Sequence, residues 1–115
     1  MAPLKTVALV TGVLLALGAS RAAAQGPDGA ALYQQNCGAC HGPKGVPAKG
    51  MLSVYPTLKA FSDPEWAKLS PDSIGAIIHN GTGKNMKGFG TRLSADQVKA
   101  IAGFVKTLSG AAHAP

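Results

Sequence analysis

The chain has 115 residues, of which 46% are hydrophobic and 14% are charged, and its formal net charge is +6. This length fits one small domain and excludes a large enzyme with its own nucleotide-binding fold. Its two cysteines allow at most one disulfide, which excludes a disulfide-stapled miniprotein, and its hydrophobic content disfavours disorder.

The first 24 residues have the composition of a secretory signal peptide. Lys5 precedes an apolar run from Val7 to Ala19, and Ala22–Ala24 resembles a cleavage site. A membrane-spanning helix needs about 20 apolar residues, and this run is shorter. We therefore expect residues 1–24 to be removed and residues 25–115 to form one exported, periplasmic domain without stable membrane insertion. An uncleaved membrane anchor is the alternative.

The expected mature chain is small, with 91 residues, of which nine are Lys or Arg and five are Asp or Glu. A domain of this size buries too little surface to be comfortably stable by itself, and it has no disulfide framework. This combination indicates a bound cofactor that forms part of the core.

Helix patterns recur along the chain, whereas strand patterns are weak. A first helix is predicted from Pro27–Asp28 to Cys37, with Asp28 at its N-terminus and Ala30, Tyr33 and Cys37 on one face. Residues 42–58 contain six Gly and Pro residues and are predicted to be irregular.

Three later segments carry helix start signals. A short helix is predicted to begin at Pro64, and a longer one from Ser70 to Gly81 presents a stripe of isoleucines. After a glycine-rich loop, a last helix is predicted from Ser94 to Gly110, where Ser94 and Gln97 match a capping box. The predicted fold class is all-α, with three or four helices.

Both cysteines lie in the segment Cys37–His41, which has the pattern C-x-x-C-H. This pattern is typical of covalent c-type haem attachment. At the end of a helix these positions share one face, so Cys37 and Cys40 can each add across a haem vinyl group while His41 faces the iron. The alternatives are a disulfide, a thioredoxin-like redox pair, which would need a βαβ setting, and a zinc site, which would need His79 or His113.

A haem iron bound by His41 needs a sixth ligand or keeps an open site. The candidates are Met51, Met86, His79 and His113. Met86 is predicted because it lies among glycines and lysines in the loop before the last helix, whereas a methionine that fills a core lies in an apolar stripe. A thioether ligand favours ferrous iron and raises the reduction potential.

The order of these features resembles the class I c-type cytochromes of the bacterial monohaem kind, over residues 26–109. The features are Gly29 with Tyr33, Cys37 to Gly42, Tyr55-Pro56-x-Leu58, Ile77 through Gly81, Met86 with Phe89-Gly90, and Leu93-Ser94. The resemblance implies a small cytochrome c fold around one covalently bound haem c. It also implies that the first and last helices cross in contact, with Gly29 and Tyr33 facing Phe104.

The resemblance further implies two residues of the haem pocket. The backbone carbonyl of Pro56 would accept a hydrogen bond from Nδ1–H of His41, which would fix the tautomer and raise the basicity of the ligand. Leu58 would pack on the haem. For both residues an ordinary loop anchor is the alternative. Trp66 would either donate to a haem propionate or, as we favour, pack in the core.

A haem with both axial positions filled by the protein has no free site for a substrate. We therefore expect a soluble one-electron carrier between exported or membrane redox proteins, and not an enzyme. One alternative is a haem ligand-binding or peroxidase-like protein with a labile methionine ligand. The other is a membrane-anchored cytochrome subunit of a respiratory or dehydrogenase complex, with residues 1–24 retained.

Basic residues flank the C-x-x-C-H motif and the methionine loop; they are Lys44, Lys49, Lys84, Lys87 and Arg92. Such a ring would steer an acidic redox partner, and a solvated basic surface is the alternative. The charge is spread out, with no basic helix or aromatic platform, so nucleic-acid binding is disfavoured. We expect a monomer.

Overall fold

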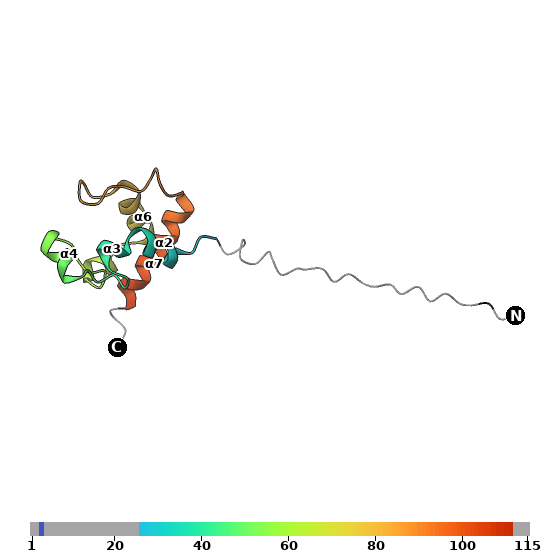
Figure 1. Cartoon of the computed structure of the whole chain (residues 1–115), viewed down its shortest axis with the longest axis horizontal. Coiled ribbons are helices and arrows are strands. Elements are labelled where there is room, and N and C mark those ends of the chain that lie inside the picture. Colours follow the sequence, from blue (N-terminus) through green and yellow to red (C-terminus); the bar gives the residue numbers. More distant parts are fainter. Residues whose placement is uncertain (1–2, 4–25, 112–115) are drawn as a thin grey trace.

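The structure is a computed structural model that describes residues 26–111 together with Pro3 (Figure 1). The predicted signal peptide, apart from Pro3, and the tail with His113 lie outside the described residues. The helices are α2 (Gly29–Asn36), α3 (Gly38–His41), α4 (Lys49–Val54), α5 (Pro64–Ala67), α6 (Pro71–Asn80) and α7 (Ala95–Ala111). Across residues 26–111 there is no strand, only an isolated bridge between Gly81 and Lys87, so the all-α prediction is confirmed.

Helices α2 and α7 cross in contact, as the resemblance implied (Figure 1). A Cβ atom on Gly29 would collide with the backbone carbonyl of Ala100, so only glycine permits this approach. One turn further along α2, the rings of Tyr33 and Phe104 lie 5.1 Å apart between centroids. The predicted apolar face is wrong at Ala30, which is exposed because the contact is centred on Gly29 and Tyr33.

The main helices begin at the residues that the sequence predicted. The carboxylate of Asp28 accepts a hydrogen bond from the first turn of α2 at 3.1 Å, and Ser70 caps α6 in the same way. The capping box before α7 is complete, because Ser94 N–H donates to Gln97 Oε1 at 2.9 Å and Gln97 N–H donates to Ser94 Oγ at 3.2 Å. These caps satisfy backbone donors that a helix start leaves free.

The prediction for residues 42–58 is partly wrong, because this segment contains helix α4. The six residues of α4 lie between Pro47 and Pro56 and include no proline, so the helix-breaking residues flank it. Gly50 lies inside α4 but has no neighbour within 4 Å of its would-be Cβ. Helix α4 therefore lies at the edge of the body (Figure 1).

The core lies where α2, α6 and α7 meet. Its buried members are Tyr33, Phe61, Ile74, Ile78, Val98, Ile101, Ala102 and Val105. Two isoleucines of the stripe predicted for α6 and four residues of α7 supply most of these side chains. Among residues 26–111, no helix is both long and apolar enough to cross a membrane.

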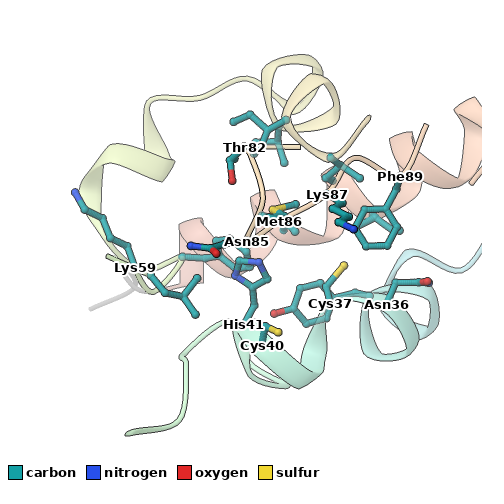
Figure 2. Close-up of a pocket in the computed structure, with 18 of the residues that line it drawn as sticks. Asn36, Cys37, Cys40, His41, Lys59, Thr82, Asn85, Met86, Lys87 and Phe89 are labelled. Atoms are coloured by element: carbon teal, nitrogen blue, oxygen red, sulfur yellow. The ribbon is translucent and has the colours of Figure 1, made fainter. Parts of the chain in front are cut away.

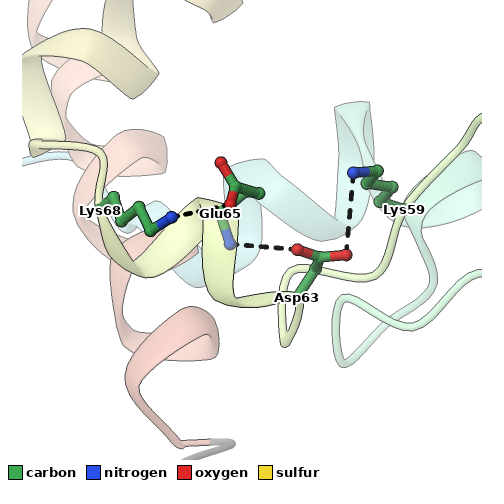
Figure 3. A network of polar contacts seen from close by, with 4 residues as sticks. All are labelled: Lys59, Asp63, Glu65 and Lys68. Atoms are coloured by element: carbon green, nitrogen blue, oxygen red, sulfur yellow. Dashed lines mark hydrogen bonds and ion pairs between the residues drawn. The ribbon is translucent and has the colours of Figure 1, made fainter.

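Short helix α5 has a capped N-terminus and two ion pairs beside it. Its N-terminus is capped by Asp63, whose carboxylate accepts from Glu65 N–H at 3.0 Å (Figure 3). The neighbouring pairs Lys59–Asp63 and Lys68–Glu65 span 3.9 and 2.8 Å and are largely exposed, so each contributes only about 0–1 kcal/mol.

A stronger tie to α5 comes from Lys106 on α7. Its half-buried ammonium donates to the carbonyls of Ala67 and Leu69 at 2.7 Å each. These carbonyls follow Trp66, so the contact fixes the chain that carries this indole.

Candidate haem site

A cavity of about 840 Å³ lies between the start of the domain and the loop that joins α6 to α7. Cys37, Cys40 and His41 line it from one side and Met86 lines it from the loop across from them (Figure 2). Its volume lies within the range of about 300–1,000 Å³ that is usual for ligand and cofactor sites. Apolar core residues complete the wall; they include Phe61, Trp66, Ile74, Ile77, Ile78, Ile101 and Val105.

The C-x-x-C-H motif forms a helical turn of its own. Cys37 ends α2 and begins α3, and its carbonyl accepts from His41 N–H at 3.0 Å. Both cysteines are free, so the structure lends no support to a disulfide between them. Cys37 is half-buried and Cys40 is exposed, and burial raises the pKa of the Cys37 thiol to about 11. The Cys37 side chain is therefore a thiol at neutral pH.

Burial lowers the pKa of His41 below its usual value and so favours the neutral imidazole. A neutral ring keeps a nitrogen lone pair, which a metal ion requires. The predicted hydrogen bond to Pro56 is not formed, since His41 Nδ1 is buried without a partner among the described residues. Pro56 is exposed at the corner of a turn that is closed by Leu58 N–H donating to the Tyr55 carbonyl at 3.0 Å. Leu58 itself lines the cavity.

The loop that carries Met86 packs backbone against backbone on the end of α6. Gly81 has a φ of +76°, and a Cβ there would lie 2.5 Å from both Met86 O and Gly88 N. Gly88 has the same constraint, because its Cβ would collide with the last carbonyls of α6. Thr82 N–H donates to Met86 O at 2.9 Å and closes the loop. This arrangement brings the Met86 side chain to the cavity wall.

The other candidate ligands lie elsewhere. Met51 is on α4 and does not line the cavity. His79 is exposed at the end of α6, where its ring lies against Gly90 and borders a separate cavity of about 260 Å³. Within the part of the chain that the structure describes, no three His, Cys, Asp or Glu side chains are grouped to hold a metal ion, as a zinc site would require.

The side chains of the cavity that carry a permanent charge are all positive. Lys59, Lys84, Lys87 and Arg92 line it, and no Asp or Glu is among its described lining residues. Arg92 lies over the ring of Phe89 with its guanidinium carbon 4.2 Å from the centroid. The predicted basic residues Lys44 and Lys49 do not reach the cavity. Cationic side chains around an apolar interior suit a ligand with an apolar body and carboxylate groups.

The donor set fits a covalently bound haem. Two thiols and a neutral imidazole face an apolar space from one side, and a soft thioether faces it from the other. Sequence reasoning did not single out Phe61 or Lys59 as residues of the site. Neither belongs to a motif, and only the fold shows that the segment after Leu58 turns back to the cavity.

Comparisons with known proteins show the family of this chain. The family profile described as "Cytochrome C oxidase, cbb3-type, subunit III" matches residues 24–105. Cytochrome c6 of Microcystis aeruginosa is 33% identical over 78 residues, which are 68% of this chain and 90% of that protein. Cytochrome c6 of Aphanizomenon flos-aquae is 34% identical over 78 residues, covering 68% of this chain and 84% of that protein.

Solved structures of a c-type cytochrome are also similar to this chain. The KustC0563 c-type cytochrome has a TM-score of 0.63 and 35% identity, over 71% of this chain and 98% of its own. A point mutant of Kustc0563 has a TM-score of 0.62 and 34% identity, over 71% of this chain and 99% of its own. Fold, cavity and relatives converge, and the chain belongs to the class I c-type cytochromes, the monohaem electron carriers built on a small all-α fold around haem c.

Proposed function

We propose that the chain carries one haem c, attached covalently through Cys37 and Cys40, with His41 and Met86 as the axial ligands of its iron. The observation that carries this proposal is that all four side chains line the same cavity (Figure 2). When bound, the haem supplies a one-electron redox centre. The residues of the chain hold the haem, orient its ligands and surround it with apolar side chains.

Those residues hold the ligands and exclude water. The glycine-dependent packing of the loop on α6 presents Met86, and burial keeps His41 neutral. Leu58 and the core side chains form an apolar lining. Pro56 acts only through the turn that orients Leu58. A fixed ligand set changes little between the two oxidation states, which favours electron transfer.

With His41 and Met86 as its two axial ligands the haem would have no free site for a substrate, so we propose a carrier and not an enzyme. A peroxidase-like reaction needs an open iron site and an acid–base group beside it. Apart from His41, no histidine and no carboxylate lines the cavity within residues 26–111. The lining therefore favours a carrier over the ligand-binding alternative.

The partner is a redox protein with an acidic docking surface. Lys84, Lys87 and Arg92 reach a cavity that no described Asp or Glu lines, and Lys59 reaches it while its ammonium pairs with Asp63 at 3.9 Å. Such a charge distribution accelerates encounter with an acidic partner and is screened by salt. We propose that the protein acts as an exported, periplasmic monomer after loss of residues 1–24.

An optical spectrum of the matured protein tests the ligand set. We expect a far-red methionine–iron band in the oxidised protein and no shift of the reduced spectrum with carbon monoxide. Met86→Ala should abolish the band and admit carbon monoxide, whereas the matched variant Met51→Ala should leave both unchanged. A band that survives Met86→Ala would refute the proposed sixth ligand.

The second candidate function is a membrane-anchored cytochrome subunit. The matched family profile favours it, because that profile is described as an oxidase subunit. In that role residues 1–24 would be retained as an anchor. The mass of the mature protein distinguishes the free carrier from the anchored subunit. A chain that begins at Gln25 supports the free carrier, and a chain that retains Lys5 and the apolar run supports the anchored subunit.

A further inference from the structure

The exposed large apolar side chains of the described residues are gathered in one short stretch of chain. They are Val46, Leu52 and Val54, which are 59%, 39% and 65% exposed. All three lie in α4 or in the turn that leads into it. Single exposed apolar residues are normal on a protein surface, whereas a cluster of them marks a binding surface. We call residues 44–54 the α4 arm.

The α4 arm is held at its base and free at its tip. Phe61 N–H donates to the Gly45 carbonyl at 2.9 Å, which ties together the two ends of the loop that contains α4. Phe61 is 4% exposed, and a Cβ on Gly45 would lie 2.8 Å from its ring, so the base belongs to the packed body. Helix α4 makes no extensive contact with another described helix and lies at the edge of the body (Figure 1). Surface loops with closely placed ends are frequently functional.

A bound haem would leave the apolar side chains of the α4 arm exposed, because none of the three lines the cavity. The chain nevertheless runs directly from the arm to the cavity. Tyr55, which follows α4, lines the cavity, and so does Leu58. A protein bound to the arm would therefore lie beside the haem site, within reach of its electron.

Charge determines the kind of partner that the α4 arm can bind. Lys44 and Lys49 are exposed in the arm, and neither forms an ion pair with a described residue. From Gly29 to Ser62 the sequence contains no Asp or Glu. Two copies of the chain would bring like charges together at the arm, which disfavours self-association. A membrane-surface helix needs a broad apolar face, which the six residues of α4 do not provide. The chemistry of the arm therefore fits the surface of an acidic protein.

We propose that the α4 arm is a docking surface for an acidic redox protein, in addition to the cationic residues that line the cavity. Val46, Leu52 and Val54 would meet an apolar patch of the partner, and Lys44 and Lys49 would face carboxylates around that patch. An apolar centre with a polar rim is the usual arrangement of a protein interface. This inference rests on the proposed function, because it requires a partner that exchanges electrons with the chain.

Stopped-flow reduction of the oxidised, haem-loaded protein tests the proposal. The probe is flavodoxin hydroquinone, an acidic protein that donates one electron to the ferric iron. Leu52→Ser/Val54→Ser should lower the second-order rate constant by about fivefold or more at every ionic strength, because apolar area no longer leaves water on docking. Leu52→Met/Val54→Ile keeps the apolar surface and should keep the rate. Reduction by ascorbate, which is too small to need the arm, should be equal in both variants and the wild type.

A matched pair of lysine variants tests the charge of the α4 arm. Lys49→Ala should lower the rate at low salt and flatten its dependence on ionic strength, because a charge at the rim of an interface acts mainly on the association rate. Lys99→Ala removes the same charge from an exposed position on α7. It should change the rate by less than about twofold.

A wild-type rate in Leu52→Ser/Val54→Ser, or equal losses in Lys49→Ala and Lys99→Ala, would overturn the proposal. If the double variant does not fold, Val54→Ser decides in the same way, because Val54 is the most exposed of the three. An unchanged flavodoxin rate together with lost binding to phosphatidylglycerol vesicles, or with lost dimers in sedimentation velocity, would assign the arm to a membrane or to a second copy. Carbon monoxide binding by the reduced wild type would refute the carrier and leave the docking result standing.

Discussion

The contact between α2 and α7 predicts that glycine-to-alanine substitutions have opposite effects at two positions. In Gly29→Ala the new Cβ would overlap the carbonyl oxygen of Ala100 and lie 2.7 Å from its carbon, whereas ordinary contacts begin at 3.4 Å. The backbone cannot rotate away, so the helices must separate by the difference, about 0.7 Å or more. Overpacking of this kind costs about 1–3 kcal/mol, and alanine recovers at most about 1 kcal/mol through helix propensity.

The expected net loss for Gly29→Ala is about 1–2 kcal/mol, which corresponds to a fall in Tm of about 4–15 °C in a domain of this size. Gly103→Ala is the control on α7, because a Cβ there meets nothing within 4 Å. It should raise stability by about 0.4–1 kcal/mol. Thermal and urea unfolding of the haem-loaded proteins, followed by far-UV circular dichroism, measures both. Equal stability of Gly29→Ala and wild type, or a loss in Gly103→Ala, would refute the close-approach argument.

Three further predictions concern the loop, the α5 tie and alkaline pH. The new Cβ of Gly88→Ala meets the backbone at the end of α6, so this variant should weaken the far-red methionine–iron band. The nearest atoms to the Cβ of Gly90→Ala belong to the movable ring of His79, so this variant should preserve the band in absorption spectra. Lys106→Met should lower the unfolding free energy by about 2–3 kcal/mol in urea titrations, against about 0.5 kcal/mol or less for exposed Lys99→Met.

The buried hydroxyl of Tyr33 makes the stability of the protein depend on pH in the alkaline range. Burial raises the pKa of Tyr33 from 10.0 to about 12, so the folded state holds the hydroxyl proton more tightly than the unfolded state. The contribution of Tyr33 to stability is therefore fully present below pH 10, and it falls by up to about 1.4 kcal/mol per pH unit as pH rises toward 12. Tyr33→Phe should flatten this dependence in pH-resolved urea titrations, and an equally steep fall in that variant would contradict the assignment.

Local chemistry explains why much of the fold was predictable. Asp28, Ser70 and Ser94 cap helices at the expected places, because capping depends on residues within one turn. Helix α4 was missed, since its existence depends on where the flanking prolines stand rather than on a strong helical pattern. Ala30 was misplaced, because only the crossing with α7 decides which face of α2 is buried.

The candidate site was predictable as far as its motif extends. Cys37, Cys40 and His41 are adjacent in sequence, and Met86 lies in a loop whose glycines mark it. The contact between Phe61 and His41 joins positions 20 residues apart with no motif between them. The exposed position of Pro56 likewise depends on a turn after α4, so neither could be inferred from spacing.

The brevity of α3 has a consequence for biogenesis. This helix has four residues, and isolated helices shorter than about 12–15 residues are marginal in water. It borders a cavity of about 840 Å³ that the apolar side chains of the chain leave unfilled. The turn that carries the cysteines therefore depends on its packing against α2 and on the hydrogen bond from the Tyr33 hydroxyl to the Gly42 carbonyl at 2.7 Å. Thioether bonds from Cys37 and Cys40 would add two covalent ties to a helix that its own hydrogen bonds cannot hold.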